Sequence, residues 1–171
     1  VGANAFDTAH LSIVHGRTLV EEPEVEIISP VAIRLRLTLR VAGDTWRDRL
    51  LRRLGHDGVC IETECWGGNF LIFHHRRVAT FTVHAALPHD ETMISIFTVS
   101  GRAAGDGSLD RFSQAMRLSA HHQASLAFVR EDERVLNGLK FQRGDLDADA
   151  DRSLSTWLDH FDALPRVDVW G

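Results

Sequence analysis

The chain has 171 residues, of which 44% are hydrophobic and 25% are charged, a balance that is ordinary for a soluble globular protein and sufficient for one sizeable core. Its formal net charge of −5 gives no reason to expect nucleic acid or an anionic membrane as a partner. No apolar stretch approaches the ~20 residues that span a bilayer, and no signal-peptide pattern opens the chain. We therefore expect one cytoplasmic domain over residues 1–171, without a membrane span.

The first part of the chain predicts a short helix and one well-defined strand. Residues 4–16 have a helical pattern that ends at Gly16, a candidate C-cap. Residues 21–29 are acidic and interrupted by proline, which is typical of a connector or an edge strand. Residues 32–41 alternate between apolar and mostly basic positions, which predicts a half-buried antiparallel strand.

The rest of the chain predicts further strands followed by two helices. Asp44 can cap a short amphipathic helix that runs to Leu54 and stops at Gly55. The remaining elements are strands at 59–65, 69–75, 78–87 and 92–99, a loop at 101–107, a long helix at 108–139 and a last helix at 147–164. This order favours an α+β fold in which a curved antiparallel sheet grips the long C-terminal helix and encloses an apolar cavity.

Cysteine usage gives little functional information. Cys60 and Cys65 are the two cysteines of the chain. Residues five apart fall on opposite faces of a strand, which disfavours a disulfide between them, so we expect two buried free thiols. Neither cysteine lies in a Cys-x-His pair, and the chain therefore cannot itself hold an iron–sulfur cluster with two cysteine and two histidine ligands.

The pattern N-x-x-D-x-x-H-x-x-x-x-H near the start of the chain is the main functional signal. It is formed by Asn4, Asp7, His10 and His15. Two imidazoles with a nearby carboxylate make a candidate pair of metal ligands and a supporting acid. Five residues on an ideal helix leave two side chains about 140° apart, so both can reach one metal only if the helix bulges or frays near His15. The four-residue spacing of the zinc-protease motif does not match.

A third ligand is expected in the charged run at 130–134 on the long helix. Asp132 shares a helical face with Ser125, Phe128, Val129, Val135, Leu136 and Leu139. Glu131 and Glu133 are rotated away from that face, and we expect both to remain in water. Two histidines and one carboxylate form a facial triad, which suits non-haem Fe(II). The alternative interpretation is a solvated charge run at the end of a helix.

The N-terminal pattern resembles the mononuclear iron motif of Rieske non-haem iron oxygenase α-subunits, and residues 128–136 are similar to the segment that holds the third ligand in that family. The resemblance implies that His10, His15 and Asp132 bind Fe(II). It also implies that Asp7 bridges His10 to a cluster-ligating histidine of a neighbouring subunit, and that Asn4 is a polar residue near the iron. The family's catalytic domain has a helix-grip (START/SRPBCC-like) fold. In the family a Rieske [2Fe-2S] domain precedes this motif, and we expect residues 1–171 to be the catalytic domain alone.

The implied function is the catalytic half of an oxygenase. A ferredoxin or reductase would supply electrons to the [2Fe-2S] cluster, and Asp7 and His10 would pass them to Fe(II), which uses O₂. The substrate would be a small apolar molecule, aromatic or polycyclic, that is hydroxylated, demethylated or desaturated. A homotrimer is implied for the full-length protein.

Seven residues are candidates for the substrate pocket, although all could equally be ordinary core. They are Phe70, Ile72, Phe81, Val83, Phe97, Ser125 and Phe128. Adjacent histidines diverge on strands and helices, so neither His74-His75 nor His121-His122 should chelate one metal. One member of each pair could face the cavity and bond a substrate oxygen. We expect His56, His89 and His160 in loops or on the surface.

Two other functions remain open. A metal-free helix-grip module that binds hydrophobic ligands would have the same strands and long helix, with no need for the triad to converge. A divalent-metal hydrolase could use the same triad, but no dedicated general base stands out in the sequence.

Overall fold

The computed structural model describes residues 2–53, 58–76, 79–89, 94–102, 108–136, 146–147 and 149–165. In chain order the elements are α1 (Gly2–Phe6), α2 (Thr8–Ile13), β1 (Arg17–Leu19), β2 (Glu24–Ser29), β3 (Ala32–Val41), α3 (Trp46–Arg53), β4 (Gly58–Trp66), β5 (Phe70–His75), β6 (Thr80–Pro88), β7 (Ile94–Arg102), α4 (Ser108–Leu136) and α5 (Arg152–Asp162). The predicted α+β class is confirmed.

The strands form one curved antiparallel sheet of seven strands in the order β1-β3-β4-β5-β6-β7, with β2 also paired to β3. The predicted strand at 32–41 is β3, which lies between β4 on one edge and both β1 and β2 on the other. Residues 24–29 form a strand rather than a connector. The short strand β1 was not predicted from the sequence, because three residues are too few for an alternation pattern.

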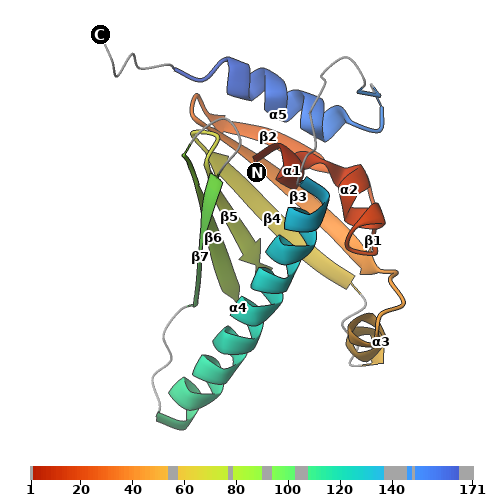
Figure 1. The fold of residues 1–171 in the computed structure, drawn as a ribbon, viewed down its shortest axis with the longest axis vertical. Coiled ribbons are helices and arrows are strands. Elements are labelled where there is room, and N and C mark those ends of the chain that lie inside the picture. Colours follow the sequence, from red (N-terminus) through yellow and green to blue (C-terminus); the bar gives the residue numbers. More distant parts are fainter. Residues whose placement is uncertain are drawn as a thin grey trace.

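The register divides the side chains into two faces of the sheet. The inner face carries the row Leu35, Thr63, Phe73, Thr82 and Ser100, and the outer face carries the neighbouring row Arg34, Glu64, Ile72, Val83 and Val99. Helix α4 crosses the strands on the inner face, and its C-terminal end lies beside α1 and α2 (Figure 1). Helix α5 crosses near one end of the sheet (Figure 1).

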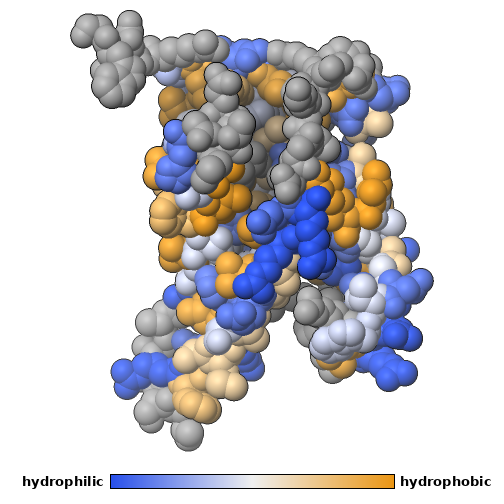
Figure 2. Space-filling model, viewed as in Figure 1, coloured by the Kyte–Doolittle hydropathy of each residue, from blue (hydrophilic) through white to orange (hydrophobic). Residues whose placement is uncertain are grey.

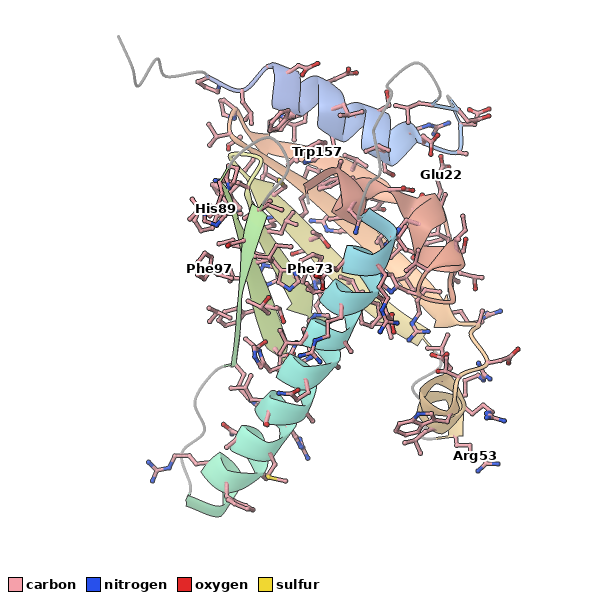
Figure 3. The ribbon with its side chains drawn as sticks, viewed as in Figure 1. Glu22, Arg53, Phe73, His89, Phe97 and Trp157 are labelled. Atoms are coloured by element: carbon pink, nitrogen blue, oxygen red, sulfur yellow. The ribbon has the colours of Figure 1, made fainter. Side chains whose placement is uncertain are left out.

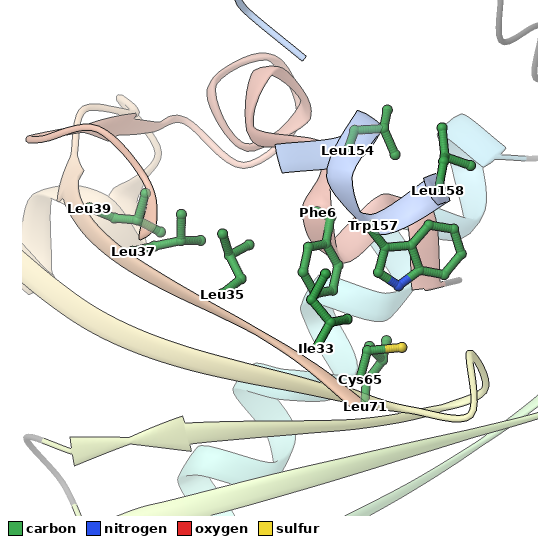
Figure 4. Packing of buried hydrophobic residues seen from close by; sticks show 10 residues of the cluster. All are labelled: Phe6, Ile33, Leu35, Leu37, Leu39, Cys65, Leu71, Leu154, Trp157 and Leu158. Carbon is green, nitrogen blue, oxygen red and sulfur yellow. The ribbon is translucent and has the colours of Figure 1, made fainter. Parts of the chain in front are cut away.

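The core lies between the inner face and the helices α1 and α5 (Figure 4). Phe6 is fully buried, and its ring centroid lies 6.1 Å from that of Trp157. Gly2 allows this packing, because a Cβ there would lie 2.4 Å from Cζ2 of Trp157. Cys65 is buried in this core, but Cys60 is exposed. The expectation of two buried thiols is therefore wrong for Cys60, which lies opposite Thr38 on the outer face.

Candidate metal centre

The N-terminal segment forms two short helices rather than the single helix predicted over residues 4–16. Asp7 separates them, and its Oδ1 accepts a hydrogen bond from the backbone N of His10 at 3.0 Å, so that Asp7 is the N-cap of α2. Helix α2 ends at Ile13, which leaves His15 in the following turn. Of the two alternatives, a bulge or fraying near His15, the structure has the second, and this removes the angular conflict with His10.

The turn after α2 is fixed by contacts to the rest of the molecule. Gly16 has a φ of +59°, and a Cβ there would lie 2.7 Å from Cα of Gly43. The guanidinium of Arg17 donates to the carbonyls of His15 and Gly16, at 2.9 and 3.2 Å, and to Oδ1 of Asp48 at 2.8 Å. These contacts hold the backbone of His15 in a non-helical position.

Asp48 is itself held by a capping box at the start of α3. Its Oδ2 accepts from N and Oγ1 of Thr45, and its backbone N donates to Oγ1 of Thr45. Thr45 rather than the predicted Asp44 therefore caps this helix. Burial raises the pKa of Asp48, but the hydrogen bonds from Thr45 and Arg17 outweigh burial and hold that pKa below its ordinary value. The buried carboxylate thus remains charged beside Arg17.

Three of the predicted site residues converge where α4 meets the N-terminal segment. Oδ1 of Asp132 lies 2.8 Å from Nε2 of His10 and 2.7 Å from Nε2 of His15. The two Nε2 atoms are 3.2 Å apart. Both histidines are 7% exposed, and the Asp132 side chain is 22% exposed. The structure therefore gathers two imidazole nitrogens and one carboxylate oxygen at one partly buried point.

The separations between these atoms fit one metal ion. Ligand atoms about 2.1 Å from an ion and at right angles to each other lie about 3.0 Å apart. The three observed separations run from 2.7 to 3.2 Å. Two imidazoles and a carboxylate on one side of an ion form a facial triad, the donor set of non-haem Fe(II) sites with open positions. His10, His15 and Asp132 thus fit such an ion in donor type and in spacing.

The electrostatics of the centre favour opposite charges on its members in the metal-free protein. Burial lowers the pKa of His15, but hydrogen bonds to Asp132 and Glu131 outweigh burial and raise that pKa above 6.5. Burial raises the pKa of Asp132, but the hydrogen bonds and charges of His15 and His10 outweigh burial and lower it. A carboxylate is costly to bury unless it is paired with a cation or bound to a metal. The positions of His10 and His15 around Asp132 allow either an ion pair with a protonated imidazole or joint binding of one metal ion.

Glu131 also contacts the centre, which the sequence did not predict, although its side chain stays partly in water as expected. Its Oε2 lies 2.9 Å from Nδ1 of His15, and its side chain is 42% exposed. The imidazole of His15 also packs against Phe128, with 4.4 Å between ring centroids. Nothing in the sequence identifies the contact between His15 and Glu131, because it depends on how the turn after α2 lies along α4. Glu133 is exposed, as predicted.

The other two residues of the N-terminal pattern lie nearby with different surroundings. Asn4 is half-buried on α1. Asp7 is half-buried, and its carboxylate accepts a hydrogen bond from the backbone N of His10 rather than from the imidazole. The polar role of Asn4 near the iron and the electron route through Asp7 stay predictions.

The predicted pocket residues fall on two separate surfaces. The five from the sheet, Phe70, Ile72, Phe81, Val83 and Phe97, belong to rows of the outer face. Figure 3 shows Phe97 on the side of β7 away from α4. Ser125 and Phe128 lie on α4 and face inward, since Oγ of Ser125 lies 3.3 Å from Oγ1 of Thr82 and Phe128 packs on His15. The structure therefore does not bring the seven residues together.

The surface that α4 covers is instead partly polar. Oγ1 of Thr82 lies 3.0 Å from Nε2 of His121, and Oγ of Ser100 lies 3.1 Å from Nδ1 of His122. The ring of His75 lies 4.4 Å from that of His121. Both members of the pair at 121–122 therefore contact the inner face, whereas of the pair at 74–75 only His75 lies on it.

Of the three histidines that were expected in loops or on the surface, one is buried. His89 is exposed, as predicted. His160 is only 8% exposed on α5, so the prediction of a surface or loop position is wrong, because the inward side of this helix covers the core. His56 lies outside the described residues.

No match to this chain was found among models of known protein families, among curated proteins or among solved structures. Within the described part of the chain, no helix is long and apolar enough to cross a membrane.

A second group of potential metal ligands occurs on the outer face. It consists of Glu62, Glu64 and His74. Arg36 and Arg76 donate to Oε2 of Glu62 at 2.9 and 2.7 Å, and Arg34 donates to Oε1 of Glu64 at 2.8 Å. A metal ion would have to displace these guanidinium groups. The group is therefore an ion-pair network, and the triad is the better candidate centre.

Proposed function

We propose that this chain is the mononuclear-iron catalytic domain of a Rieske-type oxygenase, in which His10, His15 and Asp132 hold Fe(II). The observation that carries the proposal is the convergence of two Nε2 atoms and one carboxylate oxygen within 3.2 Å of one another. The curved seven-stranded sheet with α4 across its inner face is compatible with a helix-grip fold, which supports the same assignment.

The residues of the chain would each contribute a defined part of this chemistry. Asp132 would offset part of the charge of the metal, and a set of three protein ligands would not fill the coordination sphere of Fe(II). When bound, Fe(II) supplies the redox chemistry that activates O₂. Asp7 and His10 would carry electrons from a [2Fe-2S] cluster. The two cysteines of this chain do not form the ligand set of such a cluster. A ferredoxin or reductase donor, a homotrimeric assembly and a cytoplasmic location belong to the same proposal.

The substrate is proposed to be a small apolar molecule, aromatic or polycyclic, that lies between the inner face and α4. Phe73 lies on the inner face opposite Thr82, whose hydroxyl lies 3.3 Å from that of Ser125, and Phe73 is on the α4 side of the sheet (Figure 3). These side chains can hold an apolar body and exclude water. Hydroxylation, demethylation and desaturation all fit such a site.

The test is anaerobic Fe(II) binding by the purified chain. We expect one tightly held equivalent in the wild type and its loss in His10→Ala, His15→Ala and Asp132→Ala. His74→Ala is the matched control, because His74 lies on the outer face and its loss should leave binding unchanged. Binding that is absent from the wild type, or that survives Asp132→Ala, would overturn the proposal and favour a metal-free module that binds hydrophobic ligands.

A further inference from the structure

The second ring nitrogen of His15 contacts a carboxylate outside the triad. Nδ1 of His15 lies 2.9 Å from Oε2 of Glu131, while Nε2 of the same ring points at Asp132 from 2.7 Å. A carboxylate at Nδ1 and a ligand position at Nε2, on opposite sides of one ring, are what a metal-bound imidazole requires. We infer that Glu131 is a positioning residue, which holds the proton of His15 on Nδ1 and so presents the lone pair of Nε2 to a metal.

The argument follows from which nitrogen carries the proton. A neutral imidazole has one N–H donor and one lone pair. A charged carboxylate can only accept, so Glu131 favours the tautomer with hydrogen on Nδ1. Only that tautomer leaves Nε2 free of hydrogen and able to bind a metal beside His10 and Asp132. The inference rests on the proposed metal site and adds the residue that prepares one of its ligands.

The position of His15 explains why such support is needed. Because it lies beyond the end of α2, the orientation of its ring is not set by a helix. Packing on Phe128, with ring planes tilted by 35°, limits the position of the imidazole. Packing against an apolar ring does not distinguish Nδ1 from Nε2, since both tautomers have the same shape. The hydrogen bond to Glu131 makes that distinction.

Glu133 provides a matched control for the charge of Glu131. Both glutamates lie in the last turns of α4, and Glu133 is exposed. Figure 2 shows hydrophilic side chains along the outward side of this end of the helix, so the loss of one carboxylate there should not by itself disturb folding. Glu131→Ala and Glu133→Ala remove the same charge from neighbouring positions of α4, and Glu131→Ala also removes the contact with His15.

The experiment combines anaerobic Fe(II) titration with long-range ¹H–¹⁵N NMR spectra of the Zn(II)-loaded protein. We expect Glu131→Ala to weaken Fe(II) binding by about 10–100-fold and to expose the Nδ1 proton of His15 to rapid exchange. Glu131→Gln should retain most of the affinity, because the amide oxygen still accepts the hydrogen bond. Glu133→Ala should match the wild type in both measurements.

The outcomes separate this inference from the proposed function. If the wild type binds no metal, the proposed function fails and the role of Glu131 fails with it. If the wild type binds Fe(II) but Glu131→Ala binds as tightly as Glu133→Ala, the metal site stands and the role of Glu131 is overturned. If His15 in the Zn(II)-loaded wild type carries its proton on Nε2, the inference is overturned irrespective of affinity.

Discussion

Asp7 has a structural task that its place in the N-terminal pattern does not reveal. Its carboxylate accepts the backbone hydrogen bond of His10 and starts α2, so it positions a candidate ligand through the main chain. An oxygen acceptor at the N-cap satisfies a donor that the helix cannot satisfy itself. Any part that Asp7 takes in electron transfer would therefore be combined with capping.

Substitution of Asp7 separates these two tasks. Asp7→Ala should lower the free energy of unfolding by about 1 kcal/mol, while Asp7→Asn should lower it by only a few tenths, because asparagine is an equally good N-cap. Urea denaturation of the metal-free protein measures both values. Equal destabilisation by the two substitutions would show that the negative charge, and not the cap, is what Asp7 contributes to folding.

At the same scale, the sequence located the candidate metal ligands better than the residue that supports one of them. His10 and His15 could be named from the N-terminal pattern, and Asp132 could be named because it is an acid on the apolar face of the long helix. Glu131 could not be named, since its neighbour on the helix was correctly turned inward and a helix places adjacent residues about 100° apart. The contact forms because His15 reaches along α4 from a turn, and the path of a turn is not encoded in helical periodicity.

Among the elements, α3 has a remote influence on the candidate metal centre. It carries Asp48, which holds Arg17, and Arg17 holds the carbonyl of His15. The side chains of Arg17 and Asp48 are 11% and 7% exposed, so this ion pair is largely removed from water. Removing one partner of such a pair leaves an uncompensated buried charge.

We expect Asp48→Ala to lower the free energy of unfolding by about 3 kcal/mol or more and to weaken Fe(II) binding, although Asp48 touches no ligand atom. Asp44→Ala is the control, because the side chain of Asp44 is 99% exposed and its nearest cation, Arg52, is 3.6 Å away. Thermal unfolding and Fe(II) titration of both variants measure the two effects. Unchanged Fe(II) affinity in folded Asp48→Ala would show that the turn at His15 does not depend on α3.

The strands show what alternation can and cannot predict. The pattern at 32–41 located β3 and its buried side correctly, since one of its faces is apolar and the other basic. In β5 and β6 both faces carry apolar residues. Alternation therefore divided the residues of these strands between two faces of the sheet, but it did not indicate which face α4 covers. The predicted pocket took Phe70, Ile72 and Phe81 from the outer set, and a choice shifted by one residue selects the opposite face throughout.

Over the whole molecule, the interface between the sheet and α4 gathers buried histidines whose pKa values are lowered. Burial lowers the pKa of His75 to about 4, with the charges of neighbouring histidines adding to the effect. Burial also lowers the pKa values of His84 and His121, and for His84 the charge of Asp132 opposes this. A base with a depressed pKa contributes stability above its unfolded pKa of 6.5, and this stability is lost as the pH falls through the folded value.

The stability of the protein should therefore fall as the pH is lowered from about 6.5 towards 4. The shift of His75 from 6.5 to about 4 corresponds to about 3 kcal/mol at most. His75→Gln should flatten the pH dependence of the free energy of unfolding over this interval, while His89→Gln, at an exposed position, should not. Identical pH profiles for His75→Gln and the wild type would contradict the assignment of this acid sensitivity to His75.

The candidate ligands come from distant parts of the chain, since His10 and Asp132 are separated by 122 residues. One ion bound to both would act as a cross-link, comparable to a disulfide that closes a loop of that length. Closing such a loop in an unfolded chain costs about 5 kcal/mol in entropy, and a preformed fold removes that cost before the ion arrives. Metal affinity would thus report whether the N-terminal segment and the end of α4 are packed together, and the metal would be released when these two segments separate.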